Sequence, residues 1–374
     1  MSGPVIIGGG PAGTAAAIAI ATAGRNVTLI ERNAGPADKV CGDFLSTEAI
    51  GMIETLGVDL SMASTISAVR LAHGNRIATT RLPFTARGMS RRALDEALLR
   101  RAQASGATVL RGHRVGSIEP DHASLRLACG SLGRWVADTV FLATGKHELR
   151  GAGRPDRGTG VVGLKMYCEL AASQVEALRH HVELTLFAGG YAGLQLVEAD
   201  RAVLCMLLPA TRLRAAGGQW SSLLDALTDE CPHLRERLTG ARGLLDRPLT
   251  IAGLPYGYVH APDRRDPPGL FRLGDQAAVI ASLTGDGVAL ALASGSLAAR
   301  TWIAAGSSAC YHRSLAAGLS PQMRVGSAIH RLCLAPGLQP WVAAACKLWP
   351  GAMRLAATAT RARHLTSPAS SGVG

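Results

Sequence analysis

The chain has 374 residues, of which 48% are hydrophobic and 18% are charged, a composition typical of folded globular proteins rather than of disordered ones. The formal net charge is +12, but the basic residues are scattered and aromatic residues make up only 4%, which argues against a nucleic-acid partner. The eight cysteines occur singly, without the paired spacing of a zinc site, so we expect reduced thiols and no metal.

The apolar segment 5–23 opens the chain and resembles a signal peptide or a membrane helix only in hydrophobicity. It has no basic leader, and glycines and a proline interrupt its first half. These residues favour a strand, a turn and a helix, so we expect a cytoplasmic protein. The positive charge leaves a peripheral contact with an anionic membrane surface open.

The first motif with chemical meaning is Gly8-Gly-Gly-Pro-Ala-Gly13, which has the spacing GxGxxG. It follows a short apolar strand and opens an alanine-rich helix, and the next strand, 26–31, ends on Glu31. In such a unit Gly8 permits a tight turn, Gly10 admits a pyrophosphate to the backbone, and the helix N-terminus supplies N–H donors. Glu31 can accept the hydroxyls of a ribose, and its charge disfavours a 2′-phosphate.

The middle of the chain alternates between predicted strands and two helices. A serine-capped helix spans 90–104, and a second helix spans 221–238. Predicted strands cover 64–71, 76–82, 108–111, 115–119, 123–128, 135–142, 161–170, 181–187, 191–197, 202–208 and 249–254.

The second motif follows the predicted strand 270–273 and reads Gly274-Asp275, then Gly285-Asp-Gly287, then an apolar helix from Val288. Asp275 stands at a strand end, where it can accept a hydrogen bond from a ribityl hydroxyl. The glycines let backbone N–H groups approach the pyrimidine edge of an isoalloxazine, and the helix dipole there would stabilise negative charge on reduced flavin. The two motifs together favour FAD over NAD as the resident cofactor.

These two motifs resemble the FAD-dependent oxidoreductases of the aromatic-hydroxylase and geranylgeranyl-reductase superfamily. Four further segments are similar to that superfamily: Lys39-Val-Cys-Gly-Asp-Phe-Leu-Ser46, Ser90-Arg-Arg-Ala-Leu-Asp95, Ala143-Thr-Gly-Lys-His-Glu-Leu-Arg-Gly151 and Gly189-Gly-Tyr-Ala-Gly193. The likeness runs from Val5 to about Arg300, and the first segment points to the geranylgeranyl-reductase branch.

Carried over by position, the resemblance places Arg91 at the phosphate–ribityl region of FAD, Arg32 and Val115 beside the adenosine, and Cys41 and Gly42 near the flavin. No catalytic residue is assigned; Cys41 is a weak candidate, because a single cysteine is more often a packing residue than a reactive thiol. The expected cofactor-binding residues are Gly8, Gly10, Pro11, Ala12, Gly13, Glu31, Arg32, Cys41, Gly42, Arg91, Val115, Thr144, Gly145, Gly274, Asp275, Gly285, Asp286, Gly287 and Val288.

Four more polar residues have competing interpretations. Lys165 and Tyr167 share one face of a predicted strand, where packing is favoured over a role in a pocket. Lys39 and Asp43 belong to the segment that the resemblance places near the flavin, but they could equally be solvated charges of a surface loop.

Two departures from the superfamily bear on the reaction. Ala281-Ser282 stands where a proline usually precedes the Thr-Gly turn, and the Asp-Gly pair common in hydroxylases is replaced by Thr144-Gly145. There is also no second GxGxxG, so NADH or NADPH would dock transiently at the flavin face.

The resemblance implies an NAD(P)H-driven FAD-dependent monooxygenase that hydroxylates or epoxidises a small hydrophobic aromatic or polyketide-type substrate of secondary metabolism through a flavin C4a-hydroperoxide. The alternatives are a geranylgeranyl-reductase-like enzyme that reduces an isolated C=C bond, a flavoenzyme whose substrate is attached to a carrier or another protein, and a carrier-like protein that has lost flavin. The sequence does not indicate the oligomeric state.

The expected fold class is α/β: a Rossmann-like FAD-binding domain of the glutathione-reductase type, interleaved with a β-sheet substrate domain and followed by C-terminal helices. The FAD-binding domain is predicted from 1–63, 87–160 and 256–305, and the substrate domain from 64–86 and 161–255. The remaining 306–374 is predicted to be helical and basic.

Overall fold

The first of two large sheets is built from short apolar segments that are far apart in the sequence. The computed structural model describes residues 3–155, 160–263 and 266–361, and all neighbouring strands of this sheet run parallel. Their order is β17 (Leu270–Arg272), β10 (Val140–Leu142), β1 (Val5–Ile7), β2 (Thr28–Glu31) and β6 (Thr108–Arg111).

Both faces of this parallel sheet are covered, because alternate side chains point to opposite sides. Ile6 packs in a core shared with three helices, while its neighbours Val5 and Ile7 pack in a separate core with a small antiparallel meander. The helices are α1 (Pro11–Thr22), α3 (Arg91–Ala104) and α8 (Gly287–Ile303), and the meander is β7 (Ser117–Asp121), β8 (Ser124–Ala128) and β9 (Arg134–Ala137).

The helices α1 and α8 cross in close contact. A Cβ atom at Gly295 of α8 would lie only 2.1 Å from the carbonyl oxygen of Ala12. Glycine at this position therefore lets the middle of α8 pack directly against the first turn of α1.

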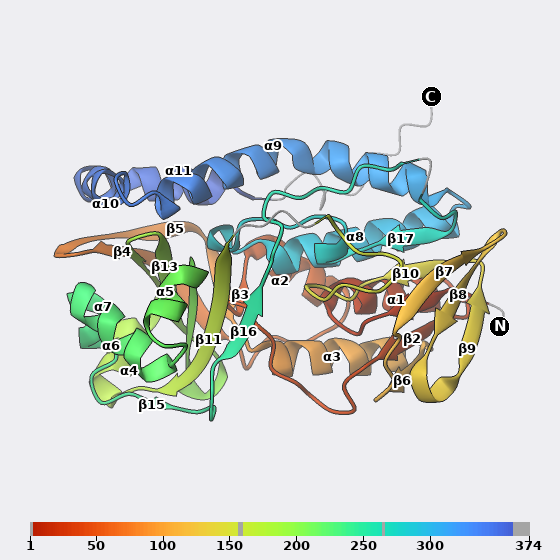
Figure 1. The fold of residues 1–374 in the computed structure, drawn as a ribbon, viewed down its shortest axis with the longest axis horizontal. Helices are drawn as coiled ribbons and strands as arrows, with labels where there is room; N and C mark the ends of the chain where they lie inside the picture. Colours follow the sequence, from red (N-terminus) through yellow and green to blue (C-terminus); the bar gives the residue numbers. More distant parts are fainter. Residues whose placement is uncertain (1–2, 156–159, 264–265, 362–374) are drawn as a thin grey trace.

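The second sheet is mostly antiparallel and forms the left half of Figure 1. Only the pairing of β12 with β4 within it is parallel. Its path is β15 (Arg242–Gly243), β11 (Val161–Glu169), β14 (Ala202–Pro209), β13 (Gly190–Leu196), β12 (His180–Phe187), β4 (Ser64–His73), β5 (Arg76–Gly88) and β3 (Phe44–Leu45), and β16 (Leu249–Ala252) pairs with β11.

Four short helices pack on one face of the second sheet, around a core that includes Leu164, Leu204, Leu223 and Leu234. They are α4 (Ala172–Leu178), α5 (Ala210–Ala215), α6 (Trp220–Glu230) and α7 (Pro232–Arg237). The opposite face of the sheet is left to line a cavity.

The C-terminal helices form a layer along the top of the molecule in Figure 1 and span both halves. The long helix α9 (Ser308–Leu334) packs against α8 and β17, whereas α10 (Gln339–Leu348) and α11 (Gly351–Ala359) pack against β5. The remaining helix, α2 (Thr47–Thr55), begins after Ser46, whose hydroxyl accepts the N–H of Ala49.

The α/β fold with C-terminal helices is thus confirmed, and two expected elements are wrong in detail. The single helix 221–238 is two helices, because Pro232 cannot donate within a helix and instead opens α7. The single strand 135–142 is two strands in different sheets, since β9 ends at Ala137 and β10 begins at Val140.

Candidate flavin site

A cavity of about 840 Å³ lies between the two sheets and beneath the C-terminal helices. Every cofactor residue expected from the sequence lines it except Gly13 and Asp286. Gly13 lies inside the contact between strand and helix, where a Cβ atom would be 2.0 Å from the carbonyl oxygen of Gly8.

One end of the cavity is the turn between β1 and α1. Gly8 has φ of +110°, and a Cβ atom there would lie 2.4 Å from the carbonyl oxygen of Ala143 on β10. The helix begins at Pro11, and no side chain caps it at Gly10. The N–H groups of its first turn are therefore available to a phosphate, with the helix dipole adding to the attraction.

Glu31 closes the adenosine end of the same cleft. Its Oε2 accepts the N–H of Gly9 at 2.7 Å, and its Oε1 accepts the N–H and side-chain amide of Asn33 at 3.0 and 2.7 Å. A carboxylate oxygen can accept more than these bonds, so Glu31, which lines the cavity, retains acceptor capacity for a ribose. Arg32 lies beside His147, with Nη2 and Nε2 2.8 Å apart.

Arg91 lies over the phosphate turn. A Cβ atom at Gly10 would be 3.3 Å from its Nη2. The guanidinium donates to both oxygens of Asp95 at 2.8 and 2.9 Å, and Lys39 also reaches Asp95, at 2.7 Å. Burial alone would raise the pKa of Asp95, but these two cations outweigh it and the pKa is lowered. Arg91 is thereby held in place as a fixed positive charge.

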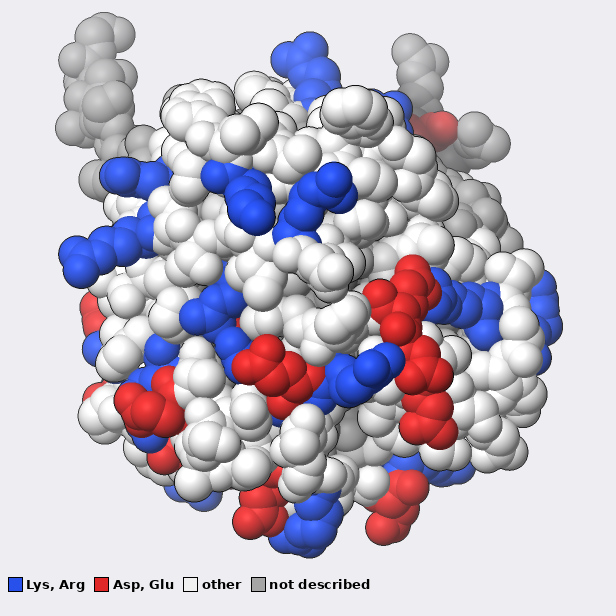
Figure 2. Space-filling model, turned by 90° about the vertical axis from the view of Figure 1, so that its left-hand side faces the viewer, with Lys and Arg blue, Asp and Glu red and all other residues white. Residues whose placement is uncertain are grey.

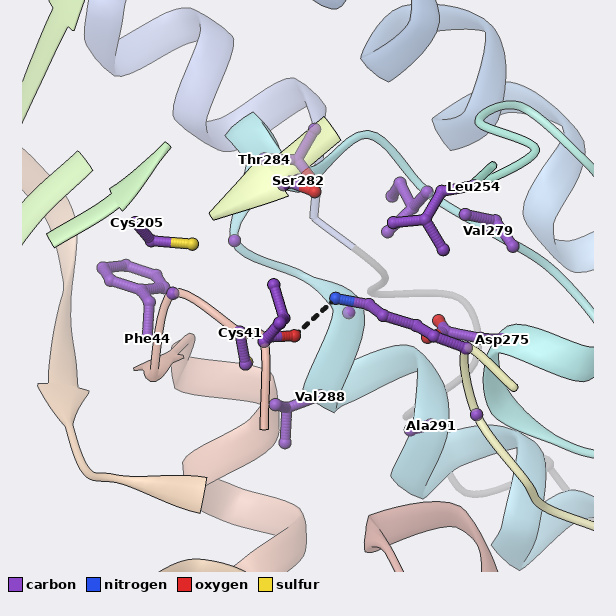
Figure 3. A pocket seen from close by; sticks show the side chains of 18 of the residues that line it. Cys41, Phe44, Cys205, Leu254, Asp275, Val279, Ser282, Thr284, Val288 and Ala291 are labelled. Atoms are coloured by element: carbon purple, nitrogen blue, oxygen red, sulfur yellow. Dashed lines mark hydrogen bonds between the residues drawn. The ribbon is translucent and has the colours of Figure 1, made fainter. Parts of the chain in front are cut away.

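The second motif is brought onto the start of α1. A Cβ atom at Gly274 would lie 3.2 Å from Cβ of Ala12, so the short 3-10 turn Gly274–Gln276 packs directly on the first motif. The chain then reaches Gly285, at φ of +72°, where a Cβ atom would lie 2.7 Å from the ring of Phe44. Figure 3 shows Asp275 facing the same space as Cys41 and Cys205, which lie on its opposite side.

Asp286 differs from its expected cofactor-binding role. Its side chain is buried away from the cavity and faces Arg361 at 2.8 Å and Gln322 at 3.1 Å, from the far end of the chain. Burial raises its pKa to about 7, although Arg361 opposes the rise. The carboxylate thus ties the C-terminal layer to the start of α8, where no side chain caps the helix and the backbone remains open to a ligand.

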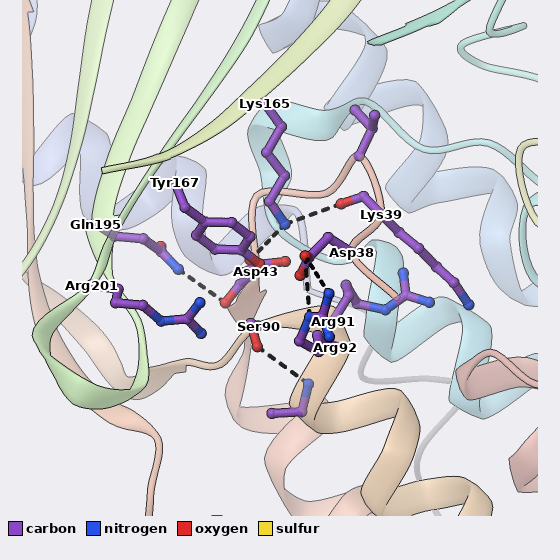
Figure 4. Close-up of polar contacts among 12 residues, drawn as sticks. Asp38, Lys39, Asp43, Ser90, Arg91, Arg92, Lys165, Tyr167, Gln195 and Arg201 are labelled. Carbon is purple, nitrogen blue, oxygen red and sulfur yellow. Dashed lines mark hydrogen bonds and ion pairs between the residues drawn. The ribbon is translucent and has the colours of Figure 1, made fainter. Parts of the chain in front are cut away.

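A buried ion pair supports the loop that carries Cys41 and Gly42 (Figure 4). Asp43, with φ of 55°, accepts Lys165 Nζ at 2.7 Å and the hydroxyl of Tyr167 at 2.5 Å, and Lys165 also donates to the carbonyl of Lys39 at 3.0 Å. Burial raises the pKa of Asp43, and Lys165 opposes the rise.

The interpretation of Asp43 as a solvated loop charge is therefore wrong. The prediction that Lys165 and Tyr167 are structural residues is confirmed, because both are buried and neither lines the cavity. A lysine within the apolar run Val161-Val-Gly-Leu-Lys-Met-Tyr167 was the signal for a buried partner.

The other end of the cavity is apolar. It runs between β4, β5 and β12–β14 on one side and the C-terminal helices on the other, and its walls include Leu71, Phe84, Leu184, Leu207, Ile329, Val342, Cys346, Met353 and Ala356. Polar groups are few in this region: the hydroxyls of Tyr256 and Ser282 lie 2.7 Å apart, and Tyr191 is close to them. Burial raises the pKa of both tyrosines, so their phenols stay protonated.

No group of three or more histidine, cysteine or acidic side chains within 3–155, 160–263 and 266–361 is arranged to hold a metal ion. The chemistry of the site therefore has to be considered from its dinucleotide cleft and its apolar chamber.

Comparison with known proteins agrees with this geometry. Residues 3–128 match the family described as "FAD binding domain". Two curated relatives are named menaquinone reductase: that of Mycolicibacterium smegmatis is 26% identical over 81% of this chain and 76% of its own, and that of Mycobacterium tuberculosis is 29% identical over 79% and 75%. The chain is an FAD-dependent oxidoreductase.

Solved structures of other flavoproteins share the fold of this oxidoreductase. A flavin-dependent brominase superposes with a TM-score of 0.76 at 14% identity, over 98% of this chain and 93% of its own. A myxobacterial FAD-dependent chondrochloren halogenase superposes with a TM-score of 0.71 at 20% identity, over 84% and 77%. The brominase likeness extends over almost the entire oxidoreductase, including its C-terminal layer.

Proposed function

We propose that this oxidoreductase reduces a carbon–carbon double bond in a substrate that joins a polar ring to a long apolar tail, such as a polyprenyl quinone. The observation that carries the proposal is the lining of the cavity, which continues from the cofactor end into an apolar chamber walled by the C-terminal helices. The chamber offers mainly side chains without charge, so it suits a hydrocarbon chain. The relatives named menaquinone reductase and the Cys41-Gly42 loop support the same choice.

The residues present fit FAD, because Glu31, the uncapped helix start beneath Arg91 and the Asp275 turn that packs on it line one continuous cleft. When bound and reduced by a nicotinamide nucleotide, FAD supplies a hydride to one carbon of the double bond.

The second carbon needs a proton, and we assign it to the hydroxyl of Tyr256. A phenol is protonated at neutral pH, and the hydroxyl of Ser282 at 2.7 Å orients it. Solvent would then return the proton to the tyrosine. The apolar walls hold the tail and exclude water from the reacting carbons.

Oxygen insertion into the same class of substrate is the second candidate. The apolar walls of the cavity favour it, because they would keep water away from a reaction with oxygen.

The two reactions are separated by incubating the FAD-loaded protein with NADH or NADPH and polyprenyl quinones, with and without oxygen, followed by mass spectrometry. A product with two additional hydrogen atoms that fragmentation places in the tail rather than on the quinone ring, formed without oxygen, supports the reductase. A product heavier by one oxygen atom, formed only in air, would replace it with the monooxygenase.

A steric variant tests the role of the apolar chamber. Val342→Trp would fill the chamber, whereas Ala344→Trp changes the same helix at a position outside the cavity wall. We expect Val342→Trp to lower kcat/KM for a long-tailed substrate by about tenfold or more, a loss of about 1.4 kcal/mol, and to spare a short-tailed one. Equal losses on both substrates would refute the assignment of the chamber to the tail.

A further inference from the structure

The outer surface of the C-terminal helices α9–α11 is apolar to an unusual degree. Of the ten large hydrophobic side chains exposed among the described residues, seven lie between 325 and 355. Trp341 is 74% exposed, Leu348 88% and Leu355 58%. Trp341 and Leu348 are seven residues apart on α10, so they lie on one face of the helix.

The C-terminal segment that carries this surface has charges of a single sign. The 88 residues that follow Asp286 contain eight arginines and lysines and no acidic residue, so they carry eight of the twelve net positive charges of the chain. Arg331, Lys347 and Arg354 are exposed within the apolar group. In Figure 2, which looks at the end of the molecule that carries α10, white and blue dominate the upper part and most of the red lies lower down.

The same surface adjoins the apolar chamber. Leu332 and Ala345 are exposed and also belong to the wall of the cavity, so the chamber comes to the surface among the exposed apolar side chains. None of the described helices has the length and apolarity needed to cross a membrane. The surface therefore has the features of a helical layer that lies in a membrane interface, with apolar and aromatic groups beside basic ones.

We propose that α10 and α11 dock the protein on an anionic lipid bilayer, with Trp341, Leu348 and Leu355 inserted among the acyl chains and Arg331, Lys347 and Arg354 against the headgroups. The mouth of the cavity then faces the lipid, so a long-tailed substrate passes from the bilayer to the cofactor without crossing water. The proposal of membrane docking is argued from the exposed apolar side chains and the charges. The route of the substrate from the bilayer to the cofactor rests in addition on the proposed function.

The test measures flotation of the FAD-loaded protein with vesicles, in the absence of substrate, so that it does not depend on the reaction. Vesicles of phosphatidylglycerol mixed with phosphatidylcholine are compared with vesicles of phosphatidylcholine alone. We expect binding to the anionic vesicles, and a decrease as salt is raised.

Two variants separate the apolar and the charged contributions. Trp341→Gln with Leu348→Gln should lower partition into anionic vesicles by about a hundredfold, because each side chain loses an apolar contact of about 1.5 kcal/mol or more. Replacing Arg331 and Lys347 by glutamine should lower it by about fivefold per charge.

Met62→Gln and Val136→Gln, at positions 70% and 51% exposed elsewhere on the molecule, are the matched controls and should bind as the parent does. A short-tailed, water-soluble substrate should be turned over equally by all of these variants, because none of the changed positions lines the cavity.

The proposal would be overturned if the α10 variants partitioned into anionic vesicles as strongly as the parent. It would also be overturned if the control variants lost as much binding as the α10 variants. So would a stable dimer, detected by sedimentation without lipid and abolished by Trp341→Gln, because a second copy would then occupy this surface.

Discussion

Replacing Asp43 by asparagine should destabilise the fold and weaken flavin binding together. Asparagine is nearly isosteric with aspartate and tolerates the left-handed backbone at φ of 55°, so the change removes the charge alone. Both Asp43 and Lys165 are 0% exposed and their polar atoms lie 2.7 Å apart. Breaking a buried pair leaves an uncompensated charge, which costs about 3–5 kcal/mol. Because Asp43 supports the loop of Cys41 and Gly42, the affinity for FAD should also fall by about tenfold.

Urea unfolding measures the first effect, and the fluorescence of FAD released on dilution measures the second. The double variant Asp43→Asn with Lys165→Met removes both charges and should recover part of the lost stability. Asp229→Asn, which breaks an exposed pair with Arg235, should cost less than about 1 kcal/mol. If Asp43→Asn unfolds at the same urea concentration as the parent and binds FAD equally well, the ion pair does not hold the loop.

Three further outcomes are expected. Gly285→Ala places a side chain at φ of +72°, at a cost of about 1–2 kcal/mol, and should lower the FAD content of the purified protein; full occupancy would contradict the close turn. Arg361→Gln leaves Asp286 without its cation and should cost about 3 kcal/mol in urea unfolding, whereas an exposed-arginine variant should cost almost nothing. Burial lowers the pKa of His312 to about 3, and its Nε2 accepts the N–H of Arg272. The unfolded chain binds a proton below pH 6.5 and the folded one does not, so stability should fall by about 2 kcal/mol between pH 7 and pH 5, and His312→Gln should flatten this slope.

The cofactor cleft could be predicted from the sequence because its constraints are local. A glycine at Gly8 is required by the nearby carbonyl of Ala143, and the helix that follows presents its N–H groups whatever the rest of the chain does. The same holds for the turn at Gly285. Spacing within a few residues therefore specified each of the two glycine motifs. The short distance between Gly274 and Ala12 shows that the two motifs meet in the folded protein.

The buried charges could not be predicted in the same way, because their partners are remote in the sequence. Asp43 pairs with Lys165 and Asp286 with Arg361, and nothing in the residues adjacent to each acid identifies its cation. A charged residue in a glycine-rich loop is usually solvated. Only the packing of the second sheet and of the C-terminal layer makes these sites dry, so their roles depend on tertiary structure.

The C-terminal layer connects the two proposals in physical terms. Arg361, just beyond α11, reaches the carboxylate of Asp286 and donates to the carbonyl of Thr284, so it touches the turn at the flavin end of α8. The same layer carries the exposed Trp341 and Leu348 and forms one wall of the apolar chamber. Arg361 therefore fixes the end of the C-terminal layer to the start of α8, and breaking this buried pair would loosen both at once. The proposed lipid-docking surface, the wall of the apolar chamber and the contact with the flavin turn thus all belong to one packed layer.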